Sequence, residues 1–123
     1  MSTTTHQAVT TADAPAPVGP YNQAVQAGGW LYCSGQIPLD PATGEMVGGG
    51  DVEAETRQVL RNLKAVLNAA GTESSKVVRT TVYLVDLADF QEVNAIYAEM
   101  FGSGVSPARA LSLIHISEPT RLR

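Results

Sequence analysis

The spacing of apolar residues changes at Asp51, and this change restricts the fold more than any other feature of the chain. From Val52 to Ala70 apolar side chains recur at steps of three and four residues, which is typical of an amphipathic helix. Asp51 is a suitable N-cap, acidic residues follow in the first turn, and Gly71 is a residue type that commonly ends a helix. We therefore predict a helix between Asp51 and Gly71.

Strands are predicted on both sides of this helix. The segment "YNQAVQAGGWLYCSGQIPLDPATGE" alternates apolar and polar residues around Gly28-Gly29, and two glycines between β-prone runs indicate a tight hairpin. The second strand of this hairpin should run from Trp30 to Gly35 and end before Pro38. The segment "KVVRTTVYLVDL" is rich in β-branched residues and predicts a central strand.

A second amphipathic helix should follow, capped by Asp86 or Asp89 and running through Phe101 to the glycines Gly102 and Gly104. The order is then β-β-α-β-α, and a further strand should begin at "PAR". The apolar faces of the two helices must be buried against another element. The simplest solution is an α+β fold in which a single mixed sheet carries both helices on one face. Residues 1–17 are rich in Thr, Ala and Pro and are interpreted as a loose lead-in with a short edge strand around His6 to Val9.

The charge of the chain argues against two classes of partner. The formal net charge is -4, and the eight Lys and Arg residues are scattered. Nucleic acids and anionic membranes are bound chiefly by clustered cations, so neither is expected as a partner. No apolar run is long enough to span a membrane, and residues 1–20 lack the pattern of a secretion signal. We therefore expect a soluble, cytoplasmic protein.

Metal and cofactor chemistry is not indicated by the sequence. Cys33 is the only cysteine, which excludes an internal disulfide and a multi-cysteine metal site. We interpret it as a small buried hydrophobic residue at the end of a strand rather than as a reactive thiol. His6 and His115 have no partner at a metal-binding spacing and are interpreted as incidental polar residues. No metal and no organic cofactor is expected.

Five short segments occur in order along the chain: "GPYNQAV" at 19–25, "SGQIPLDPATGE" at 34–45, "NLKAVLNAAG", "VVRTTVYLVDLADFQEVNAIYAEMF" and "PAR". Together, at this spacing, they resemble the reactive-intermediate deaminase family, also called the YjgF/YER057c/UK114 family. The resemblance runs from about Gly19 to Arg109. It implies a homotrimer with a chorismate-mutase-like α+β fold of β-β-α-β-α-β order, and clefts between the subunits.

The resemblance also implies an activity and a set of site residues. The best known activity of the family is the hydrolysis of 2-imino acids to 2-oxo acids and ammonia, so a 2-iminobutanoate/2-iminopropanoate deaminase-like hydrolase is expected. Arg109 of "PAR" matches the arginine that binds the substrate carboxylate. Tyr21 and Asn94 are the further catalytic candidates, and Ser34 and Gly35 are substrate-binding candidates with Arg109. The chemistry suits these residues, because a guanidinium grips a carboxylate with two parallel hydrogen bonds.

Each assignment has a structural alternative. Arg109 could form a surface or interface ion pair. Tyr21 could be a buried anchor with its hydroxyl on a backbone group, and Asn94 could be a buried polar group satisfied by nearby backbone. Ser34 could serve only as a hydrogen-bonding residue at a strand end, and Gly35 could ease a close backbone approach.

Two alternative functions stay open. One is a non-catalytic homotrimer that binds small carboxylates, and the other is a translation inhibitor or ribonuclease of the same family. The acidic balance argues against RNA binding, whereas Arg109 fits carboxylate binding with or without turnover. A chorismate-mutase activity is a third and weaker hypothesis, because a fold alone does not carry a function.

The C-terminal segment "ALSLIHISEPTRLR" departs from the family pattern. In the family, "PAR" is followed by a strand, a short turn and a last strand carrying a glutamate thought to position the attacking water. Here "LSLIHISEPTR" resembles the conceptual translation of a transposase adapter used to prepare sequencing libraries. We therefore expect one domain over residues 1–110, a non-native tail over residues 111–123, and a final strand that is missing or replaced.

The tail nevertheless alternates, so Leu111 to Ser117 could pair with the sheet. Glu118 is not expected to replace the catalytic glutamate, because it comes before any turn and return strand. An unpaired central strand edge invites non-native pairing. We expect the 123-residue chain to be poorly soluble, with little or no deaminase activity.

Overall fold

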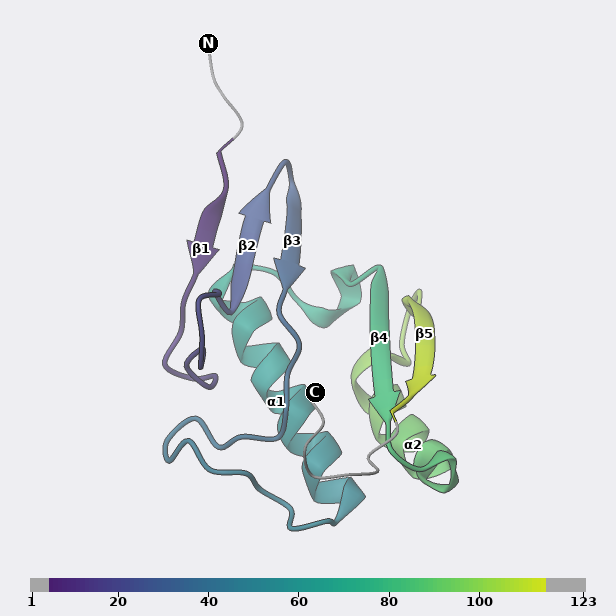
Figure 1. Ribbon diagram of the computed structural model, residues 1–123. Helices are drawn as coiled ribbons and strands as arrows, with labels where there is room; N and C mark the ends of the chain where they lie inside the picture. The colour runs from purple at the N-terminus through teal and green to yellow at the C-terminus, as the bar shows by residue number, and fades with distance from the viewer. Residues whose placement is uncertain (1–4, 115–123) are drawn as a thin grey trace.

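The first half of the molecule is an antiparallel sheet packed on a long helix. The computed structural model describes residues 5–114. The three strands lie in the order β1-β2-β3 and the helix α1 crosses behind them (Figure 1): β1 Gln7–Val9, β2 Ala24–Ala27, β3 Trp30–Cys33 and α1 Val52–Ala69. β2 and β3 form the predicted hairpin, whose turn residues Gly28 and Gly29 both have positive φ, of 58° and 82°. Glycine adopts this conformation without strain, which explains the dipeptide.

The second half is a parallel strand pair with its crossover helix. Its elements follow α1 through a short 3-10 helix, and β4 and β5 lie side by side with α2 packed behind them (Figure 1): η1 Ser74–Lys76, β4 Arg79–Leu84, η2 Leu87–Asp89, α2 Phe90–Phe101 and β5 Ala108–Leu113. The register pairs Thr80 with Arg109 and Leu84 with Leu113. A parallel pair requires a long connection, and α2 supplies it.

The predicted α+β class, with two helices on one side of the strands, is confirmed. The prediction of a single sheet is wrong in detail, because the strands of the described residues hydrogen-bond as two sheets, β1-β2-β3 and β4-β5. β3 leads into a long irregular segment, and β4 bonds with β5 alone, so no backbone ladder joins β3 to β4. The two halves are joined through their helices instead.

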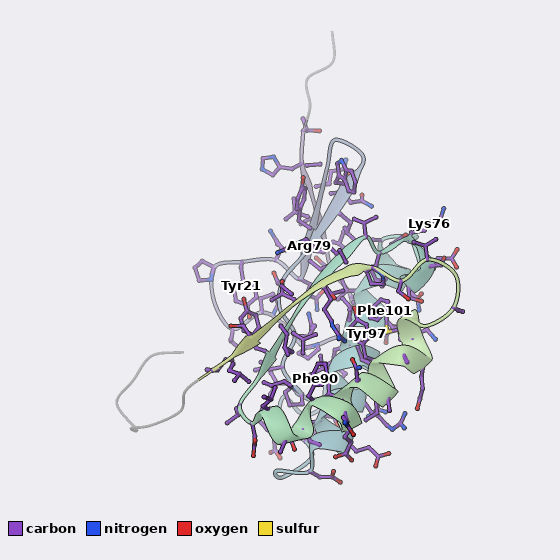
Figure 2. The ribbon with its side chains drawn as sticks, turned by 90° about the vertical axis from the view of Figure 1, so that its right-hand side faces the viewer. Tyr21, Lys76, Arg79, Phe90, Tyr97 and Phe101 are labelled. Atoms are coloured by element: carbon purple, nitrogen blue, oxygen red, sulfur yellow. The ribbon has the colours of Figure 1, made fainter. Side chains whose placement is uncertain are left out.

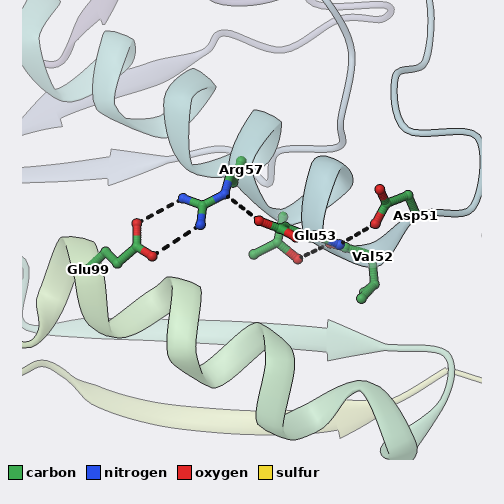
Figure 3. A network of polar contacts seen from close by, with 6 residues as sticks. Asp51, Val52, Glu53, Arg57 and Glu99 are labelled. Carbon is green, nitrogen blue, oxygen red and sulfur yellow. Dashed lines mark hydrogen bonds and ion pairs between the residues drawn. The ribbon is translucent and has the colours of Figure 1, made fainter.

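An ion pair links the two helices on the surface. Arg57 of α1 donates to Glu53 one turn earlier and, with both terminal nitrogens, to Glu99 of α2 at 2.8 and 3.1 Å (Figure 3). The hydrogen bonds that Arg57 donates lower the pKa of the Glu99 carboxyl, and the same bonds, first to Glu99 and then to Glu53, raise the pKa of Arg57. All three groups are well exposed, so the pair fixes the geometry of the helix contact more than it stabilises the fold.

The main apolar cluster lies between the first sheet and α1. Val66 of α1 is fully buried, and it packs with residues of the first 24 positions and with half-buried neighbours: Val9, Ala14, Ala24, Leu31, Ala65 and Ala70. Because β-strand side chains alternate, Trp30 and Tyr32 point away from this core and are 58% and 63% exposed. One face of the molecule therefore presents large apolar side chains to solvent.

The ends of α1 agree with the prediction. Asp51 accepts a hydrogen bond from the backbone N–H of Glu53 at 3.0 Å, as an N-cap does (Figure 3). At the other end Gly71 has φ 80°, its N–H donates to the Asn68 carbonyl, and the N–H of Thr72 donates to the Leu67 carbonyl. This pair of bonds is the Schellman arrangement, which requires a left-handed residue at the position of Gly71.

Other element boundaries differ from the prediction. Asp86 caps the 3-10 turn η2 through the N–H of Ala88, while Asp89, which precedes α2, makes no capping bond with its side chain. β3 ends at Cys33 rather than Gly35. Cys33 does end a strand, but the prediction that it is buried is wrong, since the residue is exposed. Partial cover of its thiol still raises the thiol pKa, which disfavours the reactive thiolate at neutral pH.

Among residues 5–114, no helix is both long and apolar enough to cross a membrane.

Candidate functional site

The first candidate feature is the side chain of Arg109 on β5. Its guanidinium donates a hydrogen bond to the amide oxygen of Asn94 at 2.6 Å. The guanidinium carbon also lies 4.9 Å from the centre of the Tyr97 ring and 5.5 Å from that of the Phe90 ring. Aromatic faces attract cations, so the guanidinium is held by two rings and one amide while the residue itself is exposed. We call Arg109, Asn94, Phe90 and Tyr97 the arginine cluster.

Two periodicities bring the arginine cluster together. Positions 90, 94 and 97 are spaced by four and three residues, so their side chains share one face of α2. Arg109 stands opposite Thr80 in the parallel register, and the Thr80 hydroxyl bonds the Tyr97 hydroxyl at 2.6 Å. The same face of the strand pair thus anchors the Tyr97 ring and presents Arg109 to it. Figure 2 shows Phe90 and Tyr97 along this helix face.

The second candidate feature is a shallow cavity beside the first sheet, which we call the Tyr21 cavity. It is lined by residues of the lead-in and of the segment after β3: Pro15, Ala16, Val18, Tyr21, Gln23, Ser34, Gly35, Gln36, Ile37 and Leu39. The Tyr21 hydroxyl accepts a hydrogen bond from the Val18 N–H at 3.2 Å, which leaves its own hydrogen available for another acceptor. Ser34 donates its hydroxyl hydrogen to the Asn22 carbonyl at 2.6 Å.

The lead-in part of the cavity wall is fixed by one buried side chain. Gln23 is 4% exposed. Its amide oxygen accepts from the Thr11 N–H, and its amide nitrogen donates to the carbonyls of Thr11, Ala14 and Pro15. Thr11, Ala14 and Pro15 of the lead-in are therefore bonded to Gln23, because a buried amide must be satisfied and the loop backbone satisfies it.

The structure places the five predicted residues in two groups. Arg109 and Asn94 lie in the arginine cluster of the second half. Tyr21, Ser34 and Gly35 line the Tyr21 cavity, whose lining includes no residue of the arginine cluster. Figure 2 shows Tyr21 at a separate position from Phe90 and Tyr97. Within one chain, the five candidate residues therefore fall into two groups that do not line one common cavity.

Comparisons with known proteins place the chain among relatives of similar length. A family model described as endoribonuclease L-PSP matches residues 11–116. The chain belongs to this family. A RutC family protein of Pyrococcus horikoshii is 52% identical over 103 residues, covering 84% of this chain and 80% of the relative. The mouse protein named 2-iminobutanoate/2-iminopropanoate deaminase is 49% identical over 110 residues, covering 89% of this chain and 80% of the relative.

Solved structures of the L-PSP family have the same fold. The YjgF gene product of E. coli is 41% identical with a TM-score of 0.82, covering 93% of this chain and 89% of that one. E. coli TdcF, solved with bound serine, is 34% identical with a TM-score of 0.83 and the same coverage. The YjgF-like fold implied by the sequence motifs is thus confirmed.

Sequence reasoning missed the aromatic part of the arginine cluster. Phe90 and Tyr97 belong to the apolar stripe of α2, together with the buried Val93 and Ile96. A polar Asn94 between two aromatic residues at helical spacing was the available signal. It could not be interpreted without the register of β5, which brings the cation to that face.

The described part of this L-PSP family protein contains no cluster of side chains suited to a metal ion. No group of three or more His, Cys, Asp or Glu side chains in residues 5–114 could hold a metal ion. His6 is exposed, and His115 and Glu118 lie outside the described residues. The arginine cluster offers a fixed cation for a carboxylate, and the Tyr21 cavity offers the hydroxyl hydrogen of Tyr21 on a separate wall.

Proposed function

We propose that this L-PSP family protein hydrolyses reactive 2-imino acids to 2-oxo acids and ammonia. The observation that carries the proposal is the arginine cluster: an exposed guanidinium held at fixed orientation by Asn94 and two aromatic rings, with donors left for a ligand. A guanidinium binds a planar carboxylate through two parallel hydrogen bonds. The 49% identity to the mouse deaminase supports the choice of substrate.

The reaction needs orientation and a water molecule. With the carboxylate bound to Arg109, the C=N carbon would face a water molecule. Attack by the water oxygen forms the C–O bond and breaks the π bond of C=N, while one water proton passes through a base to the nitrogen. The hydroxyl of the resulting carbinolamine then gives its proton to the nitrogen, the C–N bond breaks, and ammonia leaves as the C=O bond of the 2-oxo acid forms. Holding the reactants in place supplies most of such an acceleration. The Tyr21 hydroxyl would donate to the substrate from the second group.

The site would be completed between two copies of the chain. Because Tyr21, Ser34 and Gly35 are separate from Arg109 and Asn94 in one chain, we propose a homotrimer in which one subunit's Tyr21 cavity faces the next subunit's arginine cluster. The exposed side chains of Trp30, Tyr32 and Tyr83 would be covered in this assembly, since large exposed apolar side chains that gather in patches mark protein interfaces. We place the assembly in the cytoplasm.

We also propose that turnover by the 123-residue chain is low. The residue expected to position water is a glutamate on a last strand, and Glu118 of the tail lies outside the described residues. Binding of small carboxylates without turnover is therefore the second candidate, and the bound serine of E. coli TdcF supports it. The family name suggests RNA cleavage, but a net charge of -4 with scattered cations disfavours RNA binding.

The test uses the full 123-residue chain. 2-Iminobutanoate is generated in place by a threonine dehydratase, and its hydrolysis is followed with the protein, with Arg109→Ala and with no protein. Acceleration by the protein alone supports the deaminase. Binding of 2-oxobutanoate without acceleration supports the second candidate, and absence of both overturns the proposal.

A further inference from the structure

Asn62 is the most completely buried polar residue of α1, and it lies outside the residues assigned to the site. It is 1% exposed. Its amide nitrogen donates to the carbonyl of Ile37 at 3.2 Å and to that of Leu39 at 2.9 Å. Its amide oxygen accepts from the side chain of Gln58, one turn earlier, at 2.9 Å. Both donors and the acceptor of Asn62 are therefore used.

The network continues to the surface and fixes the rotamer of Asn62. The Gln58 amide oxygen accepts from Arg61 at 2.9 Å, so the Gln58 nitrogen must point at Asn62 and the Asn62 nitrogen must point at the loop. Asn is a poor residue for a helix interior. An apolar side chain would suit a buried position of α1 better, so the two loop carbonyls are the physical reason for an amide here.

Those carbonyls belong to a segment with little secondary structure of its own. Between β3 and α1, the backbone forms a turn at 40–44 and an isolated bridge between Leu39 and Met46. These bonds join residues of the segment to one another and not to the rest of the molecule. The bonds from Asn62 attach it to the rigid helix, and Ile37 and Leu39 both line the Tyr21 cavity.

We propose that Asn62 is a positioning residue, which fixes the Ile37–Leu39 wall of the Tyr21 cavity and thereby sets the affinity of the site for a small carboxylate. The claim that Asn62 sets the affinity rests on the proposed function. The claim that Asn62 holds the cavity wall does not, so an experiment can refute either claim without the other.

The experiment compares three variants of the full chain. Asn62→Leu replaces the amide by an apolar group of similar size. Asn68→Leu makes the same change at an exposed position of the same helix. Leu67→Ala removes a buried apolar side chain of α1 that does not line the cavity, so it lowers stability without removing a hydrogen bond to the wall. A milder variant, Gln58→Leu, removes only the group that orients Asn62, and it serves if Asn62→Leu does not fold.

Two quantities are measured for each variant, at a temperature that lies the same number of degrees below the melting temperature of that variant. The first is amide hydrogen exchange of peptides that cover residues 34–47, with peptides from β2 as the internal reference. The second is the affinity for 2-oxobutanoate by NMR titration. We expect Asn62→Leu to raise loop exchange and to weaken binding by about tenfold, because two hydrogen bonds to the loop are lost. Gln58→Leu should change both less, and Asn68→Leu and Leu67→Ala should change neither.

The outcomes separate the hypotheses. If Leu67→Ala loosens the loop as much as Asn62→Leu, the effect is general destabilisation and the positioning role is overturned. If the loop loosens but the affinity stays constant, the role at the site is overturned. If the unmodified chain binds no 2-oxobutanoate, the proposed function fails, and hydrogen exchange alone decides whether Asn62 holds the wall. Where turnover is measurable, a rise in KM with nearly constant kcat supports positioning for binding.

Discussion

At the scale of single residues, the distinctive feature is a cation whose position is fixed before any ligand arrives. A flexible surface arginine loses side-chain entropy when it binds, whereas Arg109 has already lost it to Asn94 and the rings of Tyr97 and Phe90. The fixed guanidinium should also favour ligands with planar groups such as carboxylates, since it can offer its hydrogen bonds in one plane only.

Replacement of Arg109 tests this selectivity. Arg109→Ala should weaken 2-oxobutanoate binding by about 1.5–3 kcal/mol, because a charge-assisted pair is lost. Arg109→Lys keeps the charge but loses the fork and should recover only part of the affinity. Isothermal titration measures both, with Arg79→Lys, an exposed residue of the neighbouring strand, as the control. Full affinity in Arg109→Lys would mean that charge alone matters.

Tyr97 should contribute to this preorganisation through its ring and to stability through its hydroxyl. Tyr97→Phe removes the 2.6 Å bond to Thr80 and should lower the free energy of unfolding by about 0.5–1.5 kcal/mol, with little effect on binding. Tyr97→Leu also removes the ring and should weaken ligand binding. Urea unfolding and the same titration separate the two effects. Equal affinities for the two variants would show that the ring has no role in binding.

At the scale of elements, the helix ends were predicted correctly from the sequence where they depend only on neighbouring residues. Asp51 and Gly71 bound α1 as predicted, because capping and the left-handed turn involve only neighbouring residues. The choice between Asp86 and Asp89 could not be made, because it depends on whether a 3-10 turn precedes α2. The division into two sheets was also beyond the sequence, since strand pairing is decided by residues far apart in the chain.

The candidate site also could be predicted only as far as neighbouring residues determine it. The residue types of the site were predicted from short motifs, but their division into two groups depends on the packing of β4, α2 and β5. The roles of Asn62 and Gln23 were not predicted either, because a buried amide in a helical or loop pattern gives no indication of which distant carbonyl it bonds.

The caps provide a matched pair for measurement. Asp51→Ala should lower the free energy of unfolding by about 0.5–2 kcal/mol, because the N–H of Glu53 loses its partner. Asp89→Ala should cost less, since that side chain makes no capping bond. Urea unfolding of the two variants measures the difference. Equal losses would indicate that general charge effects, rather than the capping bond, determine the result.

At the scale of the whole molecule, the proposed division of the site between two subunits predicts contact between copies of the chain. An equimolar mixture of Arg109→Ala and Tyr21→Ala chains, refolded together, should regain roughly a quarter of the intact sites, because each needs one unaltered residue from each of two neighbours. Titration with 2-oxobutanoate measures the recovery. Two preparations of Arg109→Ala mixed with each other provide the control. Recovery no greater than in this control would place the whole site within one chain.

The parallel unit of β4, α2 and β5 has a consequence for protein engineering. All four members of the arginine cluster, together with Thr80, come from one uninterrupted stretch, residues 79–113, whose own backbone ladder and crossover helix set their geometry. Strand-helix-strand units occur in a great many α/β proteins. We therefore expect that this stretch, placed in a host with a matching unit, would carry the arginine cluster and with it the carboxylate-binding part of the proposed site.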